Sequence, residues 1–123
     1  EEVPLVRADL IQLQQVVLNL VRNAIDAIAN GPTTTKAIRL MTTYDGKSVV
    51  SIYVQDTGPG IVTENETQIF DPFFTTKVSG MGLGLSISRR IIEDHGGDLR
   101  LTETSSKGCT FEITLPTSSG GLK

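Results

Sequence analysis

The feature that most constrains this chain is a long segment, from Thr57 to about Gly84, in which the apolar residues follow no period. Five of the twelve glycines and three of the four phenylalanines lie between Gly58 and Gly84. The residues on both sides, in contrast, repeat at helix or strand spacing. Because a long irregular segment in a compact domain is usually functional or mobile, we expect a functional site to involve it.

The composition bounds the class of protein. A length of 123 residues with 38% apolar residues fits one domain with a core of ordinary size. A net charge of −3 without a basic run disfavours nucleic-acid binding. The single cysteine excludes a disulfide framework and a thiolate metal cluster, and the single histidine excludes a His–His metal motif. No apolar run approaches the ~18 residues of a membrane span, and there is no signal peptide, so we expect a cytoplasmic domain without membrane contact. Because the chain begins on Glu1 rather than Met, we also expect a fragment.

The periodic segments predict an α/β fold. Helical spacing predicts one helix from Asp9 to about Ala29 and another from Leu83 to Asp94. We expect a two-layer sandwich, in which a mixed, mostly antiparallel sheet of about five strands is covered on one face by about three helices. The domain would span residues 1–116, and residues 117–123 would form a flexible tail. The other predicted elements are an edge strand at Val3–Val6, a hairpin of Ile38–Thr42 and Val50–Asp56 turning at Asp45-Gly46, a helical turn near Glu64–Ile69, and strands at Leu99–Leu101 and Cys109–Leu115.

Polar residues three or four apart form one face of the first predicted helix. Two interpretations stay open. The face could simply be solvated, as most such faces are. It could instead bind a ligand, because Asn is a poor helix former, and an amide oxygen can complete the shell of Mg²⁺ beside phosphate oxygens. These residues are Gln12, Gln15, Asn19, Asn23, Asp26 and Asn30.

The second predicted strand leads directly into Asp56-Thr57-Gly58-Pro59-Gly60. A carboxylate at the end of a strand can accept a hydrogen bond from an exocyclic amine such as that of adenine, and glycines let the backbone approach a ligand closely. An ordinary Asp-Gly turn would have the same sequence, so this motif alone leaves both interpretations open.

The middle of the irregular segment reads Phe70-Asp-Pro-Phe-Phe-Thr-Thr-Lys77. Its three phenylalanines are typical of a small hydrophobic cluster that pins a long loop, whatever the function. Thr75, Thr76 and Lys77 add hydroxyls and a flexible cation, which is a common partner for phosphate.

Gly80, Gly82 and Gly84 precede and enter the second predicted helix. The backbone N–H groups and the dipole of a helix N-terminus favour anions, and residues without side chains permit close contact with phosphate. The sequence is neither a P-loop nor a Rossmann fingerprint, since neither spacing is met. A flexible hinge with a helix cap is the plainer alternative.

Taken in order, these motifs resemble the nucleotide-binding catalytic domain of bacterial sensor histidine kinases, which shares the Bergerat fold with gyrase, the large heat-shock chaperones and the mismatch-repair ATPases. The resemblance covers about Val3 to Pro116. Asn-Ala-Ile-Asp-Ala, Phe-Phe-Thr-Thr-Lys and a short lid are similar to the nitrogen- and oxygen-sensing subclass. The matching segments are QQVVLNLVRNAIDAI (N box), DTGPGI (G1 box), DPFFTTK (F box), GMGLGLSISRRIIEDHGG (G2 box) and GCTFEITLP (closing strand).

The resemblance implies ATP or ADP and Mg²⁺ as cofactors. Asn23 would coordinate Mg²⁺, Asn19 would lie beside the phosphates, and Asp56 would recognise the adenine amine. Lys77 would be catalytic together with Asn19 and Asn23, and about Phe70 to Gly82 would form the ATP lid. The implied nucleotide-binding set is Asn19, Arg22, Asn23, Asp26, Asp56, Gly58, Gly60, Ile61, Phe70, Thr76, Lys77, Gly80, Gly82, Leu83, Gly84, Leu85 and Thr110.

Two departures from the family pattern qualify these roles. Many relatives have Lys where this chain has Asp26, so Arg22 would replace that phosphate contact. The ATPase branches have Glu where this chain has Asn19, and an amide has no usable basicity, so fast ATP hydrolysis is not expected. His95 matches the helix that follows the G2 box, where capping a helix end is an ordinary role, and not the phosphoacceptor helix.

The implied function is to present the γ-phosphate of ATP to a histidine on a separate dimerisation domain of the same kinase, with a response regulator downstream. We expect the isolated domain to be a monomer that does not phosphorylate itself, while the parent kinase could be either soluble or membrane-anchored. Two other functions compete with this one: an ATPase of the same superfamily, and an interaction module that binds nucleotide without catalysis.

Overall fold

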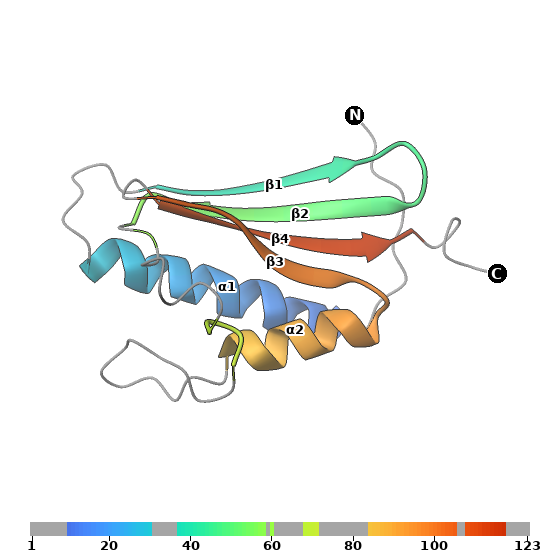
Figure 1. The fold of residues 1–123 in the computed structure, drawn as a ribbon, viewed down its shortest axis with the longest axis horizontal. Helices are drawn as coiled ribbons and strands as arrows, with labels where there is room; N and C mark the ends of the chain where they lie inside the picture. The colour runs from blue at the N-terminus through green and yellow to red at the C-terminus, as the bar shows by residue number, and fades with distance from the viewer. Residues whose placement is uncertain are drawn as a thin grey trace.

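The computed structural model describes residues 10–30, 37–58, 60, 68–71, 84–105 and 108–117. Two helices and four strands lie within these ranges (Figure 1). They follow one another as α1 (Leu10–Asn30), β1 (Ile38–Tyr44), β2 (Val49–Asp56), α2 (Gly84–Asp94), β3 (Asp98–Ser105) and β4 (Gly108–Pro116).

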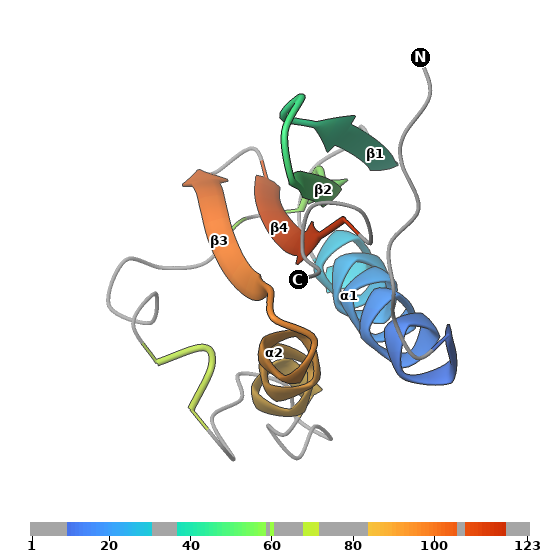
Figure 2. The same ribbon diagram turned by 90° about the vertical axis from the view of Figure 1, so that its right-hand side faces the viewer.

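The four strands form one sheet in the order β1-β2-β4-β3, and every neighbouring pair in it is antiparallel. Both helices lie on the same face of this sheet, and the two views agree on this arrangement (Figures 1 and 2). The predicted two-layer α/β fold is therefore confirmed. Two predicted elements lie wholly or mostly outside the described residues: the edge strand at Val3–Val6 and the helical turn near Glu64. A parallel strand pair, which a mixed sheet requires, could involve that edge strand and is therefore not described either.

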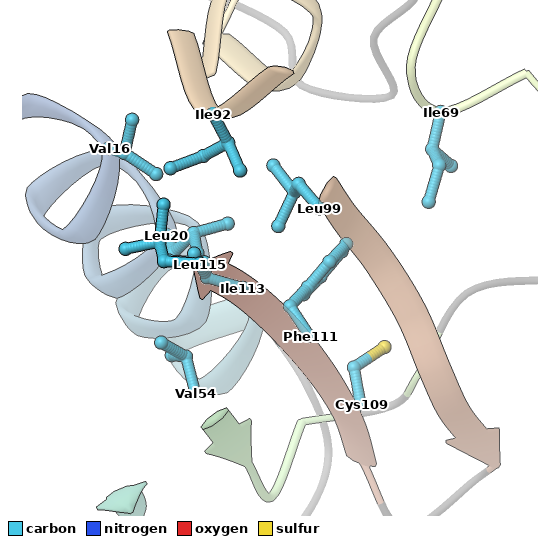
Figure 3. Close-up of a cluster of buried hydrophobic side chains, with 10 residues drawn as sticks. All are labelled: Val16, Leu20, Val54, Ile69, Ile92, Leu99, Cys109, Phe111, Ile113 and Leu115. Atoms are coloured by element: carbon cyan, nitrogen blue, oxygen red, sulfur yellow. The ribbon is translucent and has the colours of Figure 1, made fainter. Parts of the chain in front are cut away.

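The core lies between the helices and the sheet (Figure 3). On α1, residues four apart face the sheet, and on β4 every second residue does. Burying each of these large apolar side chains stabilises the fold by ~1.5–3 kcal/mol. The cluster consists of Val16, Leu20, Val54, Ile69, Ile92, Leu99, Cys109, Phe111, Ile113 and Leu115.

The β1–β2 hairpin turns where the sequence predicts it. The carboxylate oxygen Oδ1 of Asp45 accepts the backbone N–H groups of Lys47, Ser48 and Val49 at 2.8, 3.0 and 3.1 Å. Gly46 has a positive φ of 85°, which favours glycine at this position. These contacts fix the register in which Ile38 lies opposite Asp56.

One backbone hydrogen bond lies just past the end of β4. Thr117, the first residue of the predicted tail, is only 1% exposed, and its backbone N–H donates to the carbonyl of Ser48 at 2.8 Å. This bond lies one residue beyond the β2–β4 ladder, which ends with the pair of Val49 and Pro116. Among the described residues, no helix is both long and apolar enough to cross a membrane.

Candidate functional site

Asp56 is the last residue of β2, and its side chain is on the sheet face that the helices cover. The residue is 7% exposed. Its carboxylate oxygen Oδ1 accepts the backbone N–H groups of Gly58 at 2.8 Å and Cys109 at 3.4 Å. The other carboxylate oxygen accepts no hydrogen bond from the described part of the chain. Burial raises the pKa of Asp56, while the N–H groups of Gly58 and Cys109 oppose that rise.

The two described glycines that follow Asp56, Gly58 and Gly60, each lie close to a neighbouring element. A Cβ at Gly58 would lie 2.9 Å from the Cβ of Ala27 on α1, so a larger residue has no room there. Gly60 has a positive φ of 82°, and a Cβ there would collide with the carbonyl oxygen of Ser105 at the end of β3. Both glycines therefore bring the backbone close to its neighbours, with Asp56 at the centre.

Thr110, one of the expected site residues, lies on the sheet face away from Asp56. Asp56 pairs with Cys109 across the β2–β4 ladder, and Thr110 pairs with Gln55. Because paired residues share a face and successive residues alternate, the side chain of Cys109 lies with Asp56, while that of Thr110 lies on the opposite face. There the Thr110 hydroxyl accepts a hydrogen bond from Gln55 Nε2 at 3.3 Å. Figure 3 shows the Cys109 sulfur on the core side of β4.

A second group of predicted residues lies where α1 meets α2. The side-chain amide Nδ2 of Asn19 donates to the hydroxyl of Ser88 at 3.0 Å, and Ser88 is 2% exposed. A Cβ at Gly84 would lie 2.7 Å from both polar atoms of that amide. Gly84 therefore permits the close approach of α1 and α2, which is a packing role in addition to the phosphate role expected from sequence.

The rest of the α1 polar face is more exposed toward the start of the helix. Gln12 and Gln15 are exposed and Asn19, Asn23 and Asp26 are partly buried, while Arg22 is exposed beside them. The residues that the structure describes contain no group of three His, Cys, Asp or Glu side chains that could hold a metal alone. Amide and carboxylate oxygens on one helix face fit a hard cation that takes its remaining ligands from phosphate and water, as Mg²⁺ does.

Phe70 and Leu85 contribute mainly to packing. The Phe70 ring meets Phe111 edge-on at a centroid distance of 6.3 Å, and the guanidinium carbon of Arg89 lies 4.5 Å from its centroid. Leu85 packs against the core. Phe70 therefore packs against the sheet, while Phe73 and Phe74 lie outside the described residues, so the cluster of three phenylalanines stays a prediction. So do six of the expected site residues: Ile61, Thr76, Lys77, Gly80, Gly82 and Leu83.

His95 has the local role that its sequence position predicts. Its ring nitrogen Nδ1 lies 2.7 Å from the carbonyl oxygen of Ile91, one turn earlier on α2. The backbone then turns through Gly96, which has a positive φ of 83°, into β3. This histidine ends a helix, as expected.

Sequence reasoning missed two residues of this region. Cys109 is not in the expected nucleotide-binding set, although its side chain lies with Asp56 across the β2–β4 ladder. Ser88 is not in that set either. No sequence signal pairs Ser88 with Asn19, because the two residues are 69 positions apart.

Comparisons with known proteins agree with this arrangement. Residues 8–119 match the family described as "Histidine kinase-, DNA gyrase B-, and HSP90-like ATPase". The sensor protein FixL of Bradyrhizobium diazoefficiens is 44% identical over 91% of the chain, and the sensor protein TdiS of Thauera aromatica is 42% identical over 86%. The chain spans only 22% and 20% of these two relatives.

A solved structure of the catalytic domain of the histidine kinase ThkA is also similar. It is 40% identical, has a TM-score of 0.75, and aligns with 91% of this chain and 71% of its own. The chain therefore belongs to the histidine kinase-, DNA gyrase B- and HSP90-like ATPase family, in its sensor histidine kinase branch.

Proposed function

We propose that this domain binds ATP with Mg²⁺ and presents the γ-phosphate to a histidine on a separate dimerisation domain of its parent kinase. The observation that carries the proposal is Asp56. A carboxylate buried to this degree, with one oxygen already bonded to two backbone N–H groups, keeps its second oxygen as an acceptor for a ligand donor. An exocyclic amine such as that of adenine meets this requirement.

The two ends of the site would act on different parts of the nucleotide. Asp56, Gly58 and Gly60 would bind the base, and Cys109 would replace Thr110 as the side chain beside it. Asn23, with Asn19 one turn earlier, would hold the cation. When bound, Mg²⁺ would neutralise charge on the phosphates during transfer. Lys77 and the backbone at Gly82, Leu83 and Gly84 would hold the phosphates.

Asn19 favours phosphotransfer over hydrolysis. Its amide nitrogen already donates to Ser88, and an amide cannot take a proton from water as a carboxylate would. The proposed nucleophile is therefore the histidine of the separate dimerisation domain rather than water. A full-length relative of this branch, ShkA, has been solved in complex with AMPPNP and is 30% identical with a TM-score of 0.76, which supports the nucleotide as ligand.

The direct experiment adds labelled ATP and Mg²⁺ to this chain, with and without the dimerisation domain of its parent kinase. We expect saturable binding of ATP, no stable label on the chain alone, and label on the acceptor histidine when that domain is present. The labelled acceptor domain would then pass its phosphate to a response regulator. Rapid steady-state ATP hydrolysis by the chain alone would contradict the proposal, and so would stable phosphate on His95.

A further inference from the structure

The contact between Asn19 and Ser88 fixes one side chain of the α1 polar face in a single orientation. The amide nitrogen Nδ2 donates to the Ser88 hydroxyl at 3.0 Å, and the amide group lies against the backbone of Gly84. A side-chain amide has two N–H donors on its nitrogen and one acceptor oxygen. Because Ser88 accepts one N–H, the oxygen of Asn19 and its second N–H are left for a ligand.

The surroundings of Ser88 make this contact specific. Ser88 is 2% exposed, so water does not replace the hydroxyl if it is removed. A Cβ at Gly84 would lie 2.7 Å from the amide of Asn19, so the absence of a side chain there lets the amide approach α2 closely. The amide of Asn19 is therefore held by its hydrogen bond to Ser88, beside a glycine that leaves room for it.

We infer that Ser88 is a positioning residue of the nucleotide site: it holds the Asn19 amide in place at the end of the site where the cation and the phosphates would bind. The amide oxygen suits a cation, and the second N–H suits a phosphate oxygen. This inference rests on the proposed function and concerns only the end of the site at Asn19.

The experiment compares Ser88→Ala with the unchanged chain in two binding measurements, one with Mg·ADP and one with adenosine. Losing one net hydrogen bond corresponds to about a fivefold change in a binding constant. We expect Mg·ADP to bind about fivefold more weakly to Ser88→Ala. Adenosine, which has no phosphates, is expected to bind within about twofold of the unchanged chain, because its contacts are at Asp56.

A double variant tests whether Ser88 acts through Asn19. In an Asn19→Ala background, Ser88→Ala is expected to cause no additional loss of Mg·ADP affinity. An additional loss of Mg·ADP affinity in that background would overturn the inference. The matched control is Ser51→Ala, which removes another buried serine hydroxyl, one that bonds Glu112 on the opposite face of the sheet.

The outcomes separate this inference from the proposed function. If the unchanged chain binds neither Mg·ADP nor adenosine, the proposed function fails. If the unchanged chain binds both and Ser88→Ala matches it for Mg·ADP, the inference is overturned. It is also overturned if Ser88→Ala loses affinity for both ligands equally, or if Ser51→Ala reproduces the selective loss.

Discussion

The two ends of the candidate site are built in different ways. At the Asp56 end, backbone groups position the functional atom: a strand pair sets Asp56 opposite Cys109, and two backbone N–H groups bind one carboxylate oxygen. At the Asn19 end, a side chain on one helix binds a side chain on another, and a glycine makes room for the contact. The first end is set by the sheet register, and the second by how closely two helices approach.

This difference predicts different tolerance to change. A sheet register is difficult to shift, since a slip of one residue moves every side chain to the other face. Helix packing adjusts in smaller steps. We therefore expect substitutions at the Asp56 end to act sharply on binding, and substitutions at the Asn19 end to act in a graded way.

The largest expected effect comes from Asp56→Asn. The amide oxygen of Asn could still accept the N–H groups of Gly58 and Cys109, but its nitrogen would oppose a ligand amine with another donor. We expect at least about a 100-fold loss of ATP affinity, since a charge-assisted hydrogen bond is worth ~1.5–3 kcal/mol and is replaced by a clash. The melting temperature of the free domain is expected to stay equal or rise, because a buried charge has been removed. Calorimetry measures both the ATP affinity and the melting temperature. If Asp56→Asn bound ATP as tightly as the unchanged chain, Asp56 would not contact the nucleotide.

The second-largest expected effect is that the stability of the domain and its affinity for ATP change with pH in opposite directions. Because burial raises the pKa of Asp56 above its ordinary value of 3.8, the folded chain holds this proton at pH values where the unfolded chain has lost it. The contribution of Asp56 to stability therefore falls as pH rises between 3.8 and the raised pKa. ATP affinity is expected to rise over the same interval, because only the carboxylate accepts the amine. Stability and ATP affinity are measured against pH in the unchanged chain and in Asp56→Asn. Because Asn does not titrate, the difference between the two chains is the contribution of Asp56.

A third, smaller effect separates Cys109 from Thr110. Cys109→Leu adds bulk beside Asp56 and is expected to weaken ATP about tenfold, in the range of ~1–3 kcal/mol that overpacking costs. Thr110→Val keeps the shape of its side chain on the opposite face and is expected to leave ATP affinity within about twofold. Competition binding with a fluorescent nucleotide distinguishes the two variants. If Thr110→Val weakened ATP binding and Cys109→Leu did not, Thr110 rather than Cys109 would contact the base.

The smallest effect on binding is expected at Glu112, on the sheet face away from the helices. Its carboxylate accepts the Tyr53 hydroxyl at 3.1 Å and Arg100 Nη2 at 2.8 Å. Burial alone would raise the pKa of Glu112, but hydrogen bonds from Ser51, Tyr53 and Arg100 hold it below its ordinary value.

Glu112→Gln is expected to lower the free energy of unfolding by about 1 kcal/mol at neutral pH and to leave ATP affinity unchanged. Because the pKa of Glu112 is lowered in the folded chain, this advantage of the unchanged chain is lost as the pH falls through that pKa. Urea denaturation at two pH values measures this difference in the free energy of unfolding between the unchanged chain and Glu112→Gln. A loss of ATP affinity in Glu112→Gln would show that the two faces of the sheet are coupled.

The sequence predicts elements and local motifs well because each depends on near neighbours. The Asp45 turn, the start of α2 and the position of Asp56 at a strand end all follow from periodicity and turn residues. The sequence did not show that the side chain of Cys109, rather than that of Thr110, lies on the same sheet face as Asp56, because this depends on the register with the partner strand. Ser88 could not be assigned to Asn19, because contacts between helices depend on packing that no local pattern contains.

The hydrogen bond from Cys109 to Asp56 also bears on how this chain is made. It joins residues 53 positions apart, and the strand that donates it, β4, is the last of the described strands. During synthesis from the N-terminus, α1 and the β1–β2 hairpin are complete well before β4 emerges. Asp56 therefore lacks one of its two backbone donors until β4 has docked. A nascent chain stalled before Gly108 would carry every residue of the N and G1 boxes while the proposed base site is still incomplete, so nucleotide binding would report the docking of β4.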